Sequence, residues 1–81
     1  MTIKVKFFAL ARDLAGTAEA EIDVPRNSTA AAALVRVVEA FPSLSKIHAR
    51  LALAVNLAYV RQDHLLIEGD ELALIPPVSG G

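Results

Sequence analysis

The sequence contains no cysteine, only two histidines and four aromatic residues. Without cysteine the chain has no disulfide, no thiol nucleophile and no thiolate ligand for zinc or an iron–sulfur cluster. Its histidines, His48 and His64, are far apart and lack the spacing of a metal site. We therefore expect no bound metal, and any sulfur that the protein uses must come from another molecule.

Long apolar runs and a strong charge of one sign are also missing. No apolar stretch approaches the roughly 20 residues of a membrane span, and residues 1–4 lack the apolar region of a secretory signal. The net charge is -1 and the eight basic residues are scattered, which is not the pattern of a nucleic-acid-binding surface. These absences predict a cytoplasmic protein that binds neither membranes nor nucleic acids.

Catalytic patterns are missing as well. The serines lie in expected caps and loops, so no Ser/His/Asp triad has supporting context. The acids Glu68, Asp70 and Glu71 share one predicted turn, where neighbouring charges are usually solvated rather than paired for acid–base catalysis. The glycines form no phosphate-binding loop. We expect a chain without a bound cofactor and with little catalytic machinery of its own.

The residues that are present predict one compact domain, because 54% of the 81 residues are hydrophobic. Alternation of apolar and polar residues predicts strands over 2–9, 19–24, 51–56 and 71–75, and a short strand at 59–60 after a turn at 57–58. Phe8 lies on the face of the lysines, where it is either covered by a loop or exposed for a partner.

Two segments have helical spacing. Leu34, Val37, Val38 and Phe41 repeat at helical intervals after a cap at Ser28 or Thr29, and Pro42 ends this main helix. A short helical turn is expected before Gly16. Residues 43–50 are ambiguous, and their sequence is compatible with one helical turn.

This order of elements predicts an α+β fold in which one main helix packs on one face of a mixed sheet. It fits the β-grasp, or ubiquitin-like, arrangement, with the first and last strands parallel at the centre. The domain is then expected to comprise residues 1–75, and residues 76–81 form an extended tail. Because parallel strands end at the same edge, Phe8 is expected near Ile75 at the base of this tail.

The tail has an unusual composition. Pro76 and Pro77 lack a backbone N–H, so the last strand cannot continue through them. The four residues that follow, Val78, Ser79, Gly80 and Gly81, become progressively smaller, and the six-residue tail can reach about 20 Å. Such a tail can carry its carboxylate into a narrow pocket of another protein, unless it is only a flexible end or a cloning remnant.

Four stretches spread over the whole chain match one known family. They are Lys4-Val5-Lys6-Phe7-Phe8-Ala9 with Arg12, Leu14 and Gly16; Val55-Asn56; Gly69-Asp70-Glu71; and Pro76-Pro77-Val78-Ser79-Gly80-Gly81. In these stretches the chain resembles the small subunit of molybdopterin synthase, a ubiquitin-like sulfur carrier. The terminal hexapeptide is the most specific match, and it favours a functional tail.

The resemblance implies a reaction at Gly81. An adenylating enzyme related to ubiquitin-activating enzymes would use ATP to activate the Gly81 carboxylate, and a sulfur donor protein would convert it to a thiocarboxylate. The tail would then enter the large subunit of molybdopterin synthase, within a heterotetramer, and donate sulfur to cyclic pyranopterin monophosphate. Gly80 and Gly81 would keep the tail thin enough to enter, and residues 76–79 would contact the partner.

The resemblance also implies a contact surface. Phe8, Tyr59 and Ile75 match positions of the family's apolar surface, although Tyr59 and Ile75 differ from the residues expected there, so the surface is expected to be repacked against its own partner. Arg12 matches a position that contacts the activating enzyme, and a solvated surface arginine is the alternative.

Three other functions remain open. The chain could carry sulfur for thiamine or cysteine synthesis, although the Pro-Pro-Val-Ser and Phe-Phe-Ala stretches argue against this. It could be a ubiquitin-like modifier joined through Gly81 to lysines of target proteins. Lastly, it could be an interaction domain whose tail has no function.

Overall fold

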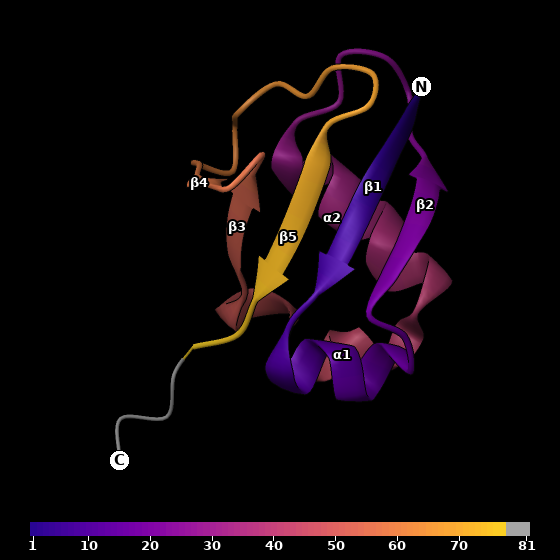
Figure 1. Cartoon of the computed structure of the whole chain (residues 1–81), viewed down its shortest axis with the longest axis vertical. Helices are drawn as coiled ribbons and strands as arrows, with labels where there is room; N and C mark the ends of the chain where they lie inside the picture. Colours follow the sequence, from indigo (N-terminus) through magenta and orange to yellow (C-terminus); the bar gives the residue numbers. More distant parts are fainter. Residues whose placement is uncertain (78–81) are drawn as a thin grey trace.

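The computed structural model describes residues 1–77, which form a five-stranded mixed sheet with the strand order β2-β1-β5-β3-β4. Strands β1 and β5 run parallel at its centre, and the other neighbours are antiparallel (Figure 1). This confirms the predicted α+β, β-grasp arrangement. The strands are β1 (Thr2–Phe7), β2 (Glu19–Asp23), β3 (Ala52–Val55), β4 (Ala58–Tyr59) and β5 (Glu71–Ile75).

Helix α2 (Ala30–Ala40) covers one face of the sheet, behind it in Figure 1. It begins where the Thr29 Oγ1 accepts a hydrogen bond from the Ala32 N–H at 3.1 Å, and it ends just before Pro42. Its apolar side packs on the inward residues of β1 and β5. The rings of Phe7 and Phe41 pack edge to face, with their centroids 5.1 Å apart. The largest fully buried side chains are Ile3, Val5, Val37, Leu44, Leu72 and Leu74.

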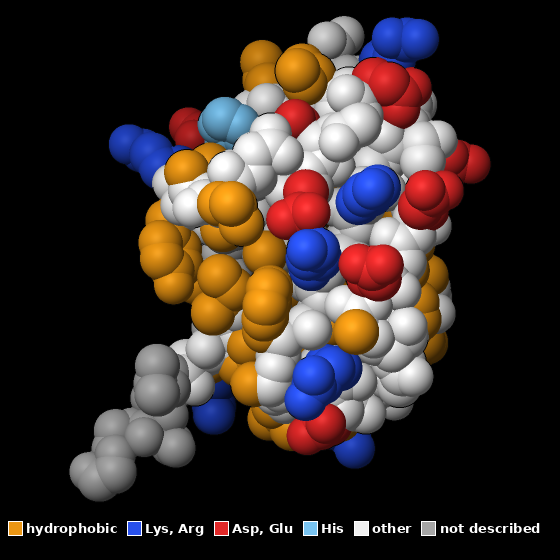
Figure 2. Space-filling view, viewed as in Figure 1, with side chains coloured by type: hydrophobic (Ala, Val, Ile, Leu, Met, Phe, Trp, Pro, Cys, Tyr) orange, Lys and Arg blue, Asp and Glu red, His pale blue; other side chains and the backbone are white. Residues whose placement is uncertain are grey.

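The opposite face of the sheet, called the open face below, has no helix over it among residues 1–77. Figure 2 shows this face, with charged side chains over β1 and β2 and apolar side chains toward β3 and β4. The charges face each other across the strands, because Lys4 lies opposite Glu21 and Lys6 opposite Glu19. The open face is therefore divided into a charged half and an apolar half.

The connections complete the fold. Helix α1 (Ala9–Ala15) joins β1 to β2 and ends at Gly16, whose φ of 77° is the left-handed conformation expected of a C-terminal cap. The ambiguous residues 43–50 form most of two 3-10 helices, η1 (Pro42–Lys46) and η2 (His48–Arg50). The turn between β3 and β4 was predicted one residue too late, since it lies at Asn56 and Leu57.

Within residues 1–77, no helix has the length and apolar character that crossing a membrane would require.

Candidate functional site

The base of the tail lies at the end of β5, where Ile75 is followed by Pro76 and Pro77. Strand β1 runs parallel to β5, with Lys6 opposite Ala73 and Phe7 opposite Leu74, so Phe8 is level with Ile75. The Phe8 N–H donates to the Leu74 carbonyl at 3.3 Å. The structure thus brings Phe8 and the end of β5 together at the point where the chain leaves the sheet.

Phe8 presents its ring on the open face. Its extended backbone (φ -113°, ψ 148°) continues the alternation of β1, which puts the ring on the side of Lys4 and Lys6. The next residue, Ala9, is left-handed at φ 48° and turns the chain into α1. Phe8 is 46% exposed, so the loop that could have covered it does not do so within the described chain.

Tyr59 lies on β4 and is 73% exposed. It pairs with Ala54, which in turn pairs with Ala73 of β5. Since neighbouring strands are about 4.8 Å apart, Tyr59 lies roughly 10 Å from β5. Ala54 and Ala73 are only 5% and 7% exposed, so larger neighbouring side chains cover them. The other apolar residues on the open face form a surface, called the apolar patch below, which consists of Phe8, Ala52, Tyr59 and Ile75.

An ion pair borders the apolar patch. The Lys6 Nζ lies 3.5 Å from the Glu71 Oε2, and both side chains are partly exposed. The pair adds little stability at this exposure. It marks the boundary between the apolar and charged halves of the open face, and charges at such a boundary favour one orientation of a partner.

Arg12 lies on α1 at the same end of the molecule as the base of the tail, because α1 begins where β1 ends. Its side chain is exposed and forms no salt bridge within residues 1–77. Contact with an activating enzyme and simple solvation both remain compatible with this position.

The predicted tail is only partly described. Pro76 is half-buried and Pro77 is exposed. The predicted site residues Val78, Ser79, Gly80 and Gly81 lie outside the described residues. The geometry therefore concerns the base of the tail and the surface beside it.

Asp70 corrects one expectation from the sequence, because it is 6% exposed rather than solvated. Its Oδ1 accepts from the Asn56 Nδ2 at 2.9 Å, and its Oδ2 accepts from the Ile67 N–H at 2.9 Å. Asn56 completes the network by accepting from the Glu71 N–H at 3.0 Å through its Oδ1. Asn56 and Asp70 appeared in the sequence only as parts of a family resemblance, and their partnership was missed.

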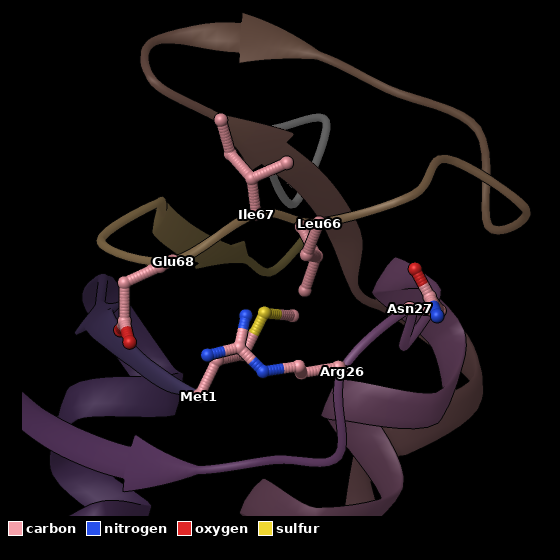
Figure 3. A pocket seen from close by; sticks show the side chains of 6 residues that line it. All are labelled: Met1, Arg26, Asn27, Leu66, Ile67 and Glu68. Carbon is pink, nitrogen blue, oxygen red and sulfur yellow. The ribbon is translucent and has the colours of Figure 1, made fainter.

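Two hollows lie away from the base of the tail. One, of about 160 Å³, is at the opposite end of the sheet; Figure 3 shows Leu66 pointing into it and Ile67 pointing away. Its lining consists of Met1, Arg26, Asn27, Leu66, Ile67 and Glu68. The other, of about 220 Å³, lies on the charged half beside Lys4 and Glu21. Residues 1–77 hold no group of three or more His, Cys, Asp or Glu side chains suited to a metal ion.

Comparison with known proteins gives matches along the whole chain. A family model described as the ThiS family matches residues 5–81. The molybdopterin synthase sulfur carrier subunit of Arabidopsis thaliana is 40% identical over 79 residues, which are 98% of this chain and 82% of the relative. The protein of the same name from Drosophila melanogaster is 43% identical over 84 residues, covering 100% of this chain and 92% of the relative.

Solved structures share the fold. SAMP1 from Haloferax volcanii superposes with a TM-score of 0.90 and 31% identity, and the match covers 100% of both chains. A complex of subunits 1 and 2 of the molybdopterin-converting factor from Helicobacter pylori contains a chain that matches with a TM-score of 0.72 and 23% identity over 100% of both chains. The second likeness is one of fold alone.

Proposed function

Because this chain belongs to the ThiS family, we propose that it is the sulfur carrier subunit of a molybdopterin synthase. The identity of 40% or more to subunits of that name extends over nearly the whole chain. The observation that carries the proposal is the exposed apolar patch beside the end of β5, from which a tail ending in Gly-Gly continues. A cytoplasmic location remains part of the proposal.

The proposed partner is the large subunit of the synthase, in a heterotetramer of two large and two small chains. The fold likeness to a chain in the Helicobacter pylori complex supports a partner of this kind. The apolar patch offers a docking surface, and a tail of six residues can reach about 20 Å beyond it. The patch would hold the partner while the tail enters its active site, so catalysis would belong to the large subunit.

The chemistry at Gly81 requires activation. A carboxylate is a poor acyl group at neutral pH, so a dedicated adenylating enzyme would first join it to AMP from ATP with release of pyrophosphate. Sulfur at the oxidation level of sulfide, delivered by a donor protein, would then attack the acyl carbon and displace AMP, which leaves a thiocarboxylate. The bound thiocarboxylate sulfur would reach the cyclic pyranopterin substrate at a high effective concentration, because it is tethered within the complex.

The decisive measurement is the intact mass of the chain produced together with its activating enzyme. We expect a mass increase equal to the exchange of one oxygen for sulfur, located at Gly81. Deletion of Gly81 should abolish both this increase and sulfur transfer to the pyranopterin, while the chain stays folded. Normal molybdopterin formation by the deletion variant would contradict the proposal.

A second candidate function is protein modification. SAMP1, described in a second solved structure as a small archaeal modifier protein, matches this chain at a TM-score of 0.90. If the chain is a modifier, its Gly81 carboxylate would be joined to lysine amines of target proteins. Digests would then contain Gly-Gly remnants on those lysines. Their presence without a thiocarboxylate would favour this function over sulfur transfer.

A further inference from the structure

The turn between β3 and β4 contains Leu57, whose backbone conformation is unfavourable for a leucine. Asn56 and Leu57 have positive φ angles of 50° and 73°, as in a two-residue hairpin turn of the I′ kind. Asparagine tolerates this conformation, but the second position is usually glycine, and a leucine there is strained. The Leu57 side chain is also 91% exposed, so burial within the described chain does not offset the strain.

The turn itself is held firmly. The Asn56 N–H donates to the Glu71 carbonyl at 2.9 Å, and the Asn56 side chain bonds both the Glu71 N–H and the buried carboxylate of Asp70. These bonds tie the turn to the start of β5. Leu57 is therefore presented at a fixed place, which lowers the conformational entropy that a partner must remove.

Leu57 also lies next to the apolar patch. It is two residues from Tyr59, in the same hairpin, and Tyr59 belongs to the patch that ends at the base of the tail. From strand spacing and rise, Leu57 lies roughly 15 Å from Ile75. A standard interface of about 800 Å² per partner corresponds to a disc of about 16 Å radius. An interface of ordinary size centred on Ile75 therefore reaches Leu57.

We propose that Leu57 is a partner-binding residue, which extends the apolar patch and inserts into an apolar depression on the large subunit. This rests on the proposed function. The large subunit is the favoured occupant because a chain of the same fold is solved in a complex of subunits 1 and 2 of the molybdopterin-converting factor. The activating enzyme is the other occupant, and the test below distinguishes the two. Strain and exposure at Leu57 are then retained because the complex buries the side chain.

The test uses Leu57→Gly, which should not lower the stability of the isolated chain but should weaken its binding to the large subunit. Glycine adopts the left-handed conformation freely, so the urea midpoint of the isolated chain should equal or exceed that of the wild type. Affinity for the purified large subunit should fall about tenfold, which corresponds to losing part of a buried leucine. Leu57→Asn, which also tolerates positive φ, should weaken binding similarly without the added flexibility of glycine.

Val35→Ala is the matched control. Val35 is 49% exposed, but it lies on α2, which covers the face of the sheet opposite the open face, so its loss should leave affinity unchanged. If Leu57→Gly binds as tightly as the wild type, the inference is wrong. It is also wrong if the variant binds normally but loses thiocarboxylation, because Leu57 would then serve the activating enzyme. Failure of the wild type itself to bind the large subunit would instead contradict the proposed function.

Discussion

Asp70 has an environment that its local sequence does not predict, because neighbouring acids in a turn are usually solvated. It is buried, and its two carboxylate oxygens serve the Asn56 amide and the Ile67 N–H. Asp70→Ala should lower the free energy of unfolding by about 2 kcal/mol, because both donors lose their acceptor in a partly buried site. Urea denaturation followed by circular dichroism would measure this loss.

Asp63→Ala provides the comparison for Asp70. The Asp63 side chain is 77% exposed and lies 3.6 Å from Arg61 in a surface ion pair. Its removal should change the free energy of unfolding by no more than about 0.5 kcal/mol. Equal losses at the two positions would mean that the Asp70 network does not stabilise the fold.

The same residue shows what a local pattern can predict. Gly69 and Asp70 indicate a turn, and a turn is present. Whether its acids are solvated depends on Asn56, fourteen residues earlier, and on the pairing of β3 with β5 that brings Asn56 to Asp70. Phe8 gives the complementary case. Period-two alternation predicts its face from neighbouring residues, whereas its exposure depends on distant segments.

At the scale of elements, Thr29 starts α2 by accepting from the Ala32 N–H. Thr29→Ala should lower the free energy of unfolding by about 1 kcal/mol, because one N–H of the first turn loses its acceptor. Thr29→Ser keeps the hydroxyl and should retain most of the stability. The measurement is again urea denaturation, and a serine variant as unstable as the alanine variant would show that the methyl group matters more than the cap.

Elements with strong periodicity were predictable, and those without it were not. Alternation indicated β1, β2, β3 and β5, and helical spacing indicated α2, because each has one face against the core. Residues 43–50 have no clear period. They form 3-10 turns because Leu44 and Ile47 are buried three residues apart. The β3–β4 turn was predicted one residue too late because its position is set by the hydrogen bonds of the Asn56 side chain, whose partners Asp70 and Glu71 lie in another segment.

For the whole molecule, the order of elements was sufficient to predict the fold, since one helix can cover only one face of the sheet. The parallel pairing of β1 and β5 then brings the end of the first strand and the base of the tail together. The surface beside the tail could be predicted in outline, because the strand arrangement indicated Phe8 and Ile75 and the family resemblance indicated Tyr59. The strained Leu57 could not, because alternation does not reveal backbone strain in a turn.

The hydrophobic core and the tail occupy separate parts of the chain. All buried hydrophobic residues of the described chain lie between Ile3 and Leu74, so the core ends before Pro76. A chain that ends at Pro77 should unfold at the same urea concentration as the full chain, within about 0.5 kcal/mol in free energy, yet accept no sulfur. Leu74→Ala, in a fully buried position of a central strand, should instead lose about 3 kcal/mol. A marked loss of stability in the truncated chain would show that residues 78–81 contribute to folding, and the domain could not then be limited to residues 1–75.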